Sequence, residues 1–131
     1  MSIQNLPRSV AAPDRNAEAR LQAAIVEWVR TVAPDVLVFA VPNGGLRSKA
    51  EAARLKWTGV VAGVPDLCVI APGGRAHFIE IKTPCGRLSE AQRDVIGVLA
   101  RLGSPVMTVT SIDDVRRAFS GWGIETREAA R

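Results

Sequence analysis

The chain has 131 residues, of which 47% are hydrophobic, so it is long enough for one domain with a core and too short for two ordinary ones. A net charge of +4 is compatible with a polyanionic partner such as nucleic acid. The absence of tyrosine and the 5% aromatic content argue against an aromatic stacking platform for single strands.

The sequence also argues against a membrane-spanning protein, a secreted protein and a zinc-binding protein. No apolar run approaches the ~18 residues that a membrane-spanning helix needs, and the first residues lack the apolar core of a secretory signal. Two cysteines and one histidine cannot build a zinc site of the usual spacing. We therefore expect a reduced, cytoplasmic protein with no membrane partner.

The first predicted helix follows a flexible arm at residues 1–13 and spans residues 16–32. At ~100° per residue, its apolar side chains share one face, and Glu18 projects onto that face one turn before Leu21. Glu27 projects to the opposite side, toward water. Glu18 is therefore either a first-turn acid stabilised by the helix dipole or a residue that points toward the sheet.

A strand at residues 36–41 is apolar throughout, so we expect it to be buried on both faces. A helix at residues 49–57 follows, with Ser48 and Glu51 as its capping box. Four basic side chains lie in or next to this helix: Arg47, Lys49, Arg54 and Lys56. The cluster is either a solvated helix face or a set of contacts to DNA phosphates.

The central stretch, residues 63–84, is predicted to be two short strands joined by a turn at Gly73-Gly74. The order of elements mixes one hairpin with crossover helices, so we expect an α/β fold with a mixed sheet and helices on both faces. We place the domain at residues 14–120 and a tail at residues 121–131. Three elements are expected after the hairpin: a helix at 89–102, a strand at 105–110 and a helix at 112–119.

The turn of the hairpin decides whether three charged residues meet. Glu80 and Lys82 are two apart on a strand and face the same way. A two-residue Gly73-Gly74 loop would place Asp66 opposite Ile81, on the wrong face. A three-residue loop, Gly73-Gly74-Arg75, would place Asp66 opposite Lys82 and diagonal to Glu80. Convergence therefore requires a loop with an odd number of residues or a bulge.

If the three side chains converge, they suit metal-dependent hydrolysis of a phosphodiester. Asp66 and Glu80 are hard oxygen ligands of the kind that Mg²⁺ prefers, and the backbone carbonyl of Ile81 is a further candidate ligand. Lys82 would stabilise negative charge in the transition state. Glu18 would complete the acidic set through water.

Each of these residues also has a structural interpretation. Glu80 lies in a strongly apolar strand, and an ion pair with Lys82 alone would satisfy a buried carboxylate there. Gln92 either serves only as the capping-box partner of Ser89 or also contributes to the active site. His77 is expected to be a surface histidine near the turn.

Five short motifs follow one another along the chain: VPNGG-R at residues 41–47, GVPDL at 63–67, FIEIK at 78–82, GRLSEAQ at 86–92 and a Gly-x-Pro-Val strand start at 103–106. Together they resemble the VRR-NUC domain of the PD-(D/E)xK nuclease superfamily, over residues from about 18 to 115. The resemblance implies a restriction-endonuclease-like αβββαβ core, with the helix before Asp66 as an insertion.

The resemblance also implies roles for individual residues. Asp66 and Glu80 would bind the metal, Mg²⁺ or Mn²⁺, and Lys82 would be catalytic. Glu18 matches the acidic residue of the first helix in the pattern E-x-x-L-Q, and Gln92 matches the polar residue on the helix after the ExK.

Domains of this size resemble phage-type proteins that act on branched DNA, often as homodimers. We therefore expect a metal-dependent endodeoxyribonuclease selective for structures such as Holliday junctions or flaps. The alternative is a non-catalytic DNA-binding or assembly module that has kept the nuclease fold.

Overall fold

The computed structural model of the chain describes residues 16–42 and 48–128. The predicted arm at residues 1–13 and the basic residue Arg47 lie outside the described residues. The elements are, in chain order, α1 (Ala17–Val32), β1 (Leu37–Ala40), α2 (Lys49–Trp57), β2 (Leu67–Ile70), β3 (Ala76–Ile81), α3 (Glu90–Arg101), β4 (Val106–Val109) and α4 (Ile112–Trp122).

The four strands form one mixed sheet in the order β1-β2-β3-β4. The first two pairings are antiparallel, and β3 pairs with β4 in parallel because α3 makes the crossover between them. With α2 inserted between β1 and β2, the order of elements is the predicted αβββαβ core. The predicted fold class is therefore confirmed.

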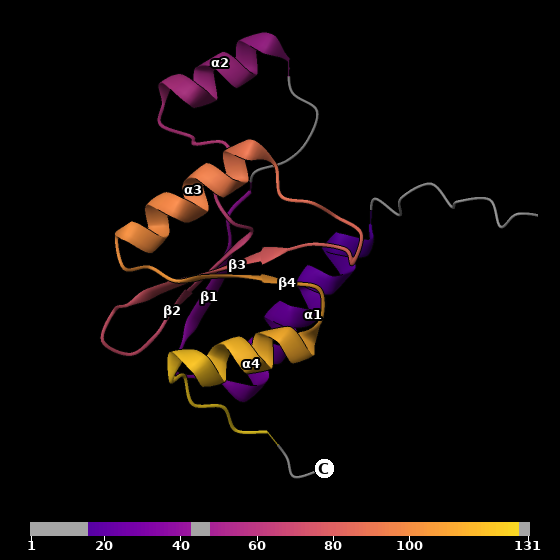
Figure 1. Ribbon diagram of the computed structural model, residues 1–131, viewed down its shortest axis with the longest axis vertical. Helices are drawn as coiled ribbons and strands as arrows, with labels where there is room; N and C mark the ends of the chain where they lie inside the picture. Colours follow the sequence, from indigo (N-terminus) through magenta and orange to yellow (C-terminus); the bar gives the residue numbers. More distant parts are fainter. Residues whose placement is uncertain (1–15, 43–47, 129–131) are drawn as a thin grey trace, which may run out of the picture.

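The two faces of the sheet are covered differently. The apolar core lies between the sheet and the pair α1 and α4, and it includes Ile25 and Val29 of α1 and Phe119 of α4. Helix α3 covers the opposite face, and α2 stands beyond it as the outermost element (Figure 1). Because side chains alternate along a strand, Ile79 and Ile81 of β3 enter the core while Glu80 faces α3.

The prediction that the first strand is buried on both faces was wrong. In β1 only Val38 is buried, whereas Leu37 is 61% and Phe39 is 42% exposed. The strand is an edge strand that pairs with β2 alone, and no helix covers its outward face in the described part of the chain.

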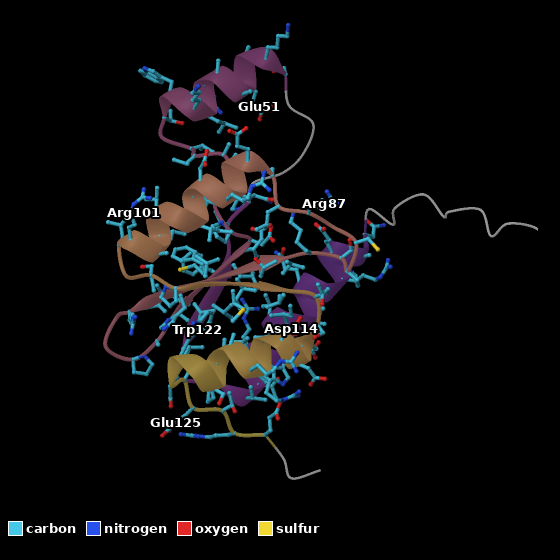
Figure 2. All side chains as sticks on the ribbon, viewed as in Figure 1. Glu51, Arg87, Arg101, Asp114, Trp122 and Glu125 are labelled. Atoms are coloured by element: carbon cyan, nitrogen blue, oxygen red, sulfur yellow. The ribbon has the colours of Figure 1, made fainter. Side chains whose placement is uncertain are left out.

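Helix α4 extends to Trp122, beyond the predicted end at residue 119, and the following segment packs back onto the core. Figure 2 shows Asp114 and Trp122 at the two ends of this helix. Ile124 is buried, and the Glu128 carboxylate accepts a 2.6 Å hydrogen bond from Trp28 Nε1 and pairs with Arg116. These contacts attach the predicted tail to α1. No helix among the described residues is long and apolar enough to cross a membrane.

Candidate active site

The hairpin between β2 and β3 closes with an odd loop, as convergence of the charged residues requires. Ala71 N donates to Arg75 O at 3.1 Å, which leaves a three-residue loop from Pro72 to Gly74. Gly73 and Gly74 both have positive φ, which glycine adopts without strain. The predicted loop of Gly73 to Arg75 was therefore one residue too late.

This shift changes which residues oppose each other. The last paired residues are Leu67 and Ile79, so one step further Asp66 lies opposite Glu80 rather than opposite Lys82 as predicted. Asp66 Oδ2 accepts a 2.7 Å hydrogen bond from the backbone N of Ile81. That bond ties the Asp66 carboxylate to the edge of β3 beside Glu80.

Glu80 is a buried carboxylate with one satisfied and one unsatisfied oxygen. Its side chain is only 2% exposed. Glu80 Oε1 accepts a 2.9 Å hydrogen bond from Gln92 Nε2, and Lys82 Nζ lies 3.6 Å from the same oxygen. Glu80 Oε2 is buried and has no hydrogen-bond partner among the described residues. An orphaned buried oxygen of this kind is costly, and a cation beside it would remove the penalty.

The pKa of Glu80 reflects these surroundings. Burial and, next, the negative charge of Asp66 raise it from 4.5 to about 7, while the positive charge of Lys82 opposes the rise. One lysine therefore does not fully compensate the two carboxylates, so an ion pair with Lys82 does not by itself account for the buried charge.

Gln92 forms the predicted capping box and also contacts Glu80. Its side-chain Oε1 accepts a 2.8 Å hydrogen bond from Ser89 N, and its backbone N–H donates to Ser89 Oγ at 3.1 Å, which completes a capping box at the start of α3. Because the cap occupies the oxygen, the amide nitrogen is turned toward Glu80. The cap thus orients the donor that reaches the carboxylate.

A cavity of about 510 Å³ opens beside Asp66 and Gln92. Gln22, from α1, and Gly63 also line it. Gly63 has φ +89°, and a Cβ there would lie 2.4 Å from the backbone of Ala91, so only glycine allows this segment to pack on the first turn of α3. Gln22 is the last residue of the E-x-x-L-Q pattern that begins at Glu18, and its position one turn after Glu18 was the signal that could have identified it as a site residue.

Glu18 is not brought into this group. Its side chain is exposed, and it does not line the cavity. Among the described residues, no group of three or more His, Cys, Asp or Glu side chains is arranged to hold a metal ion. The first-turn interpretation of Glu18 is sufficient for what the structure shows. Asp66 and Glu80 remain as a pair of carboxylates, which is a donor set that fits Mg²⁺ with water completing its coordination.

The backbone of Ile81 faces the same pair. The N–H and C=O groups of one strand residue point toward the same neighbouring strand, so the Ile81 carbonyl is directed toward the side of Asp66 that its N–H contacts. That orientation keeps the carbonyl as a candidate ligand.

The predicted DNA contacts lie on α2, away from the carboxylates in the fold. Lys49, Arg54 and Lys56 are exposed on this helix, which has no buried residue. Figure 2 shows another basic residue, Arg87, at the end of the sheet where α3 begins, whereas Arg101 lies at the far end of α3. Arg87 was not predicted as a site residue, although its position five residues after Lys82 places it next to the ExK strand.

Comparison with known proteins gives one consistent answer. The family model described as VRR-NUC domain matches residues 5–113. A solved structure described as a VRR_NUC domain protein superposes with a TM-score of 0.67 at 26% identity, and the alignment covers 83% of this chain and 90% of that one. A second, described as a VRR_NUC domain, superposes with a TM-score of 0.60 at 23% identity and covers 81% and 97% of the two chains. No curated protein matches the chain. With the match covering most of its length, the chain belongs to the VRR-NUC domain family, whose fold is that of nucleases acting on DNA.

Proposed function

We propose that this protein is a Mg²⁺- or Mn²⁺-dependent endodeoxyribonuclease that hydrolyses phosphodiester bonds and prefers branched DNA. The observation that carries the proposal is the pair of opposed carboxylates, Asp66 and Glu80, in which Glu80 Oε2 is buried and has no hydrogen-bond partner in the described part of the chain. Without a cation at this place, burial and the charge of Asp66 would oppose the ionisation of Glu80 more than Lys82 favours it, at a cost in stability.

The residues that would hold the metal are Asp66 and Glu80, together with the carbonyl of Ile81. Glu18 remains a proposed partner through water. When bound there, the cation would lower the pKa of water and neutralise negative charge that builds up on the phosphate. Two carboxylates with several retained waters is the coordination that Mg²⁺ accepts most readily in proteins.

Lys82 would act on the substrate phosphate, whereas Gln92 would hold Glu80 in position. Lys82 Nζ lies 3.6 Å from Glu80 Oε1, and its side chain is partly exposed, so its ammonium group could also contact a phosphate oxygen of the substrate. Gln92 would act as a positioning residue, because its amide is fixed by the cap and holds one oxygen of Glu80. Glu80 would thereby present its second oxygen toward the cation.

The raised pKa of Glu80 couples metal binding to proton release. With the pKa at about 7, Glu80 is largely protonated below neutral pH, and a cation must displace that proton to bind. Metal affinity and cleavage should therefore rise with pH up to about 8 and then level off. Because one proton is lost from Glu80, the pH profile of cleavage should show a single ionisation on its acid side.

The basic side chains of α2, Lys49, Arg54 and Lys56, are the proposed contacts to DNA phosphates, together with Arg47. A homodimer would place two active sites on one junction, as the paired cuts of a branched substrate require, and light scattering measures that state directly. The second candidate function is a DNA-binding or assembly module without catalysis. It has no use for Asp66, Glu80 and Lys82 at one place, so the convergence of these residues favours the enzyme.

The experiment is cleavage of a panel of end-labelled DNAs by the purified protein: duplex, single strand, flap and four-way junction, each with Mg²⁺, Mn²⁺ or EDTA. We expect metal-dependent cleavage that is faster on the branched substrates. Lys82→Ala should abolish it, whereas Arg101→Ala, at the far end of α3, should not. Binding to the panel without cleavage in either metal would instead support the non-catalytic module.

A further inference from the structure

Helix α2 carries charged and apolar side chains that do not pack within the domain. None of its residues is buried, and it stands outside the layers of the domain (Figure 1). Lys49, Arg54 and Lys56 form no ion pair with any other described residue, and Glu51 is the only acid on the helix. A short helix with no packed face gains little stability from the domain, so its surface is available to a partner.

Trp57, the last residue of α2, is the most exposed large apolar side chain among the described residues, at 86%. It makes no ring contact there, in contrast to Trp28 and Trp122, which pack against Phe119. An indole combines a large apolar face with a donor at its edge, and such rings are on average highly buried in folded domains. The exposure of Trp57 therefore has no structural benefit within this chain.

A hollow made of three cavities that share lining residues lies between Asp66 and this helix. The cavity beside Asp66, about 510 Å³, shares Val41, Pro42 and Val64 with a second cavity of about 320 Å³. The second shares residues 59–61 with a third, of about 560 Å³, which is lined by Leu55 and Lys56 of α2. The third cavity reaches Lys56, the residue before Trp57, so the hollow extends from Asp66 toward the end of α2.

We propose that Trp57 stacks on an unpaired base of the DNA substrate while the basic side chains of α2 hold the adjoining phosphates. The inference rests on the proposed function and adds the feature that the enzyme recognises: a base without a partner, displaced from the site of cleavage along the hollow. Every base has a π-face, so one indole can select unpaired bases without reading sequence. Indole stacking and lysine or arginine contacts to phosphate are the two components of single-strand recognition.

Charge favours DNA over a second copy of this chain as the occupant. The helix carries Lys49, Arg54 and Lys56 against a single Glu51, and the whole chain has a net charge of +4. Two copies that met through α2 would bring like charges together, whereas a phosphate backbone complements them. The 5% aromatic content does not oppose the inference, because one exposed ring is sufficient for one base.

The test is binding of the full-length protein to two fluorescein-labelled duplexes of equal length, one fully paired and one with a single-base bulge, by fluorescence anisotropy in EDTA. We expect Trp57→Ala to weaken binding to the bulged duplex by about 5- to 150-fold and binding to the paired duplex much less. Trp57→Phe should recover most of the loss. Leu37→Ala, which truncates another exposed apolar residue at the opposite end of the sheet, should change neither affinity.

Two results would overturn the inference. One is equal affinity of wild type and Trp57→Ala for the bulged duplex. The other is a fall in mass by light scattering in Trp57→Ala at the protein concentration of the assay, which would make a second copy the occupant. The substrate panel separates this outcome from failure of the proposed function. If the wild type cleaves DNA and Trp57→Ala binds the bulged duplex as well as the wild type does, the nuclease function stands and the role of Trp57 is refuted. If Trp57→Ala weakens binding but the wild type cleaves no substrate, the role of Trp57 stands and the nuclease function is refuted.

Discussion

Replacing Glu80 by glutamine separates the charge of this side chain from its shape. The amide retains an oxygen that can accept from Gln92, so the packing around α3 is preserved. The pKa of Glu80 is raised from 4.5 to about 7, and each pH unit between the two values is worth about 1.4 kcal/mol. Full ionisation of Glu80 in the folded state thus lowers the free energy of unfolding by about 3 kcal/mol.

The sign follows from where the proton is held. Between pH 4.5 and 7 the unfolded chain releases the Glu80 proton while the folded chain retains it, so the stability of the wild type falls as the pH rises. Glu80→Gln has no such proton to lose. We expect the two proteins to have similar stability near pH 4.5, and the variant to be more stable by about 3 kcal/mol at pH 8 in the absence of metal.

Urea unfolding at half-unit steps from pH 4.5 to 8.5, in EDTA, measures this difference directly. Glu27→Gln, an exposed acid on α1, controls for the loss of one negative charge. Repeating the series with Mg²⁺ adds a readout that is independent of activity, because the cation should stabilise the wild type at pH 8 and leave Glu80→Gln nearly unchanged. A difference between wild type and Glu80→Gln that is the same at pH 5 and pH 8 would refute the reasoning about the buried charge.

Two further substitutions test the surroundings of the site. Gly63→Ala places a Cβ 2.4 Å from the backbone of Ala91 at a positive φ, so we expect a loss of about 2–4 kcal/mol in urea unfolding; an unchanged midpoint would contradict the close packing. Gln92→Ala removes the side-chain oxygen that accepts from Ser89 N and the donor to Glu80, whereas Ser89→Ala removes only the oxygen that accepts from the backbone N of Gln92, at about 1 kcal/mol. We expect Gln92→Ala to cleave more slowly at saturating Mg²⁺ and Ser89→Ala to cleave at the wild-type rate. Equal rates for the two variants would show that Gln92 acts only as a cap.

The sequence predicted the fold well because its signals were local. Capping residues such as Ser89 and apolar periodicity placed the helices within a few residues of their observed bounds. The errors arose where tertiary neighbours decide. An apolar strand such as β1 is equally consistent with a central or an edge position, and only the pairing shows that it is an edge. His77 was expected at the surface, yet it is 2% exposed and stacks on Trp122 at 4.8 Å between ring centroids.

The candidate site was predictable in its residues and less so in its geometry. Glu80 and Lys82 are two residues apart on one strand, so they share a face of the sheet regardless of the tertiary structure around them. The partner of Asp66 depended on a one-residue difference in the loop, which the Gly-Gly sequence does not determine. The position of the Glu18 side chain depends on how far the first turn of α1 extends along the sheet. Helical periodicity does not determine that distance.

Exposure was the property that sequence reasoning could not supply. Trp57 occupies the end of a helix whose sequence has the composition of an ordinary surface helix, and nothing local shows that its ring remains uncovered. The ring is uncovered because α2 lies outside the layers of the fold.

The most direct test of the nuclease assignment is single-turnover cleavage of a labelled branched DNA by wild type and by Lys82→Ala, purified in the same way, in Mg²⁺. Lys82 lies 3.6 Å from the buried Glu80 carboxylate and is partly exposed, so its loss should leave the fold intact while it removes charge from the site. We predict cleavage by the wild type that EDTA abolishes, and a loss of at least about 100-fold in rate for Lys82→Ala. Equal rates for the two proteins, or no cleavage by the wild type on any branched substrate, would contradict the assignment of Asp66, Glu80 and Lys82 as a catalytic centre.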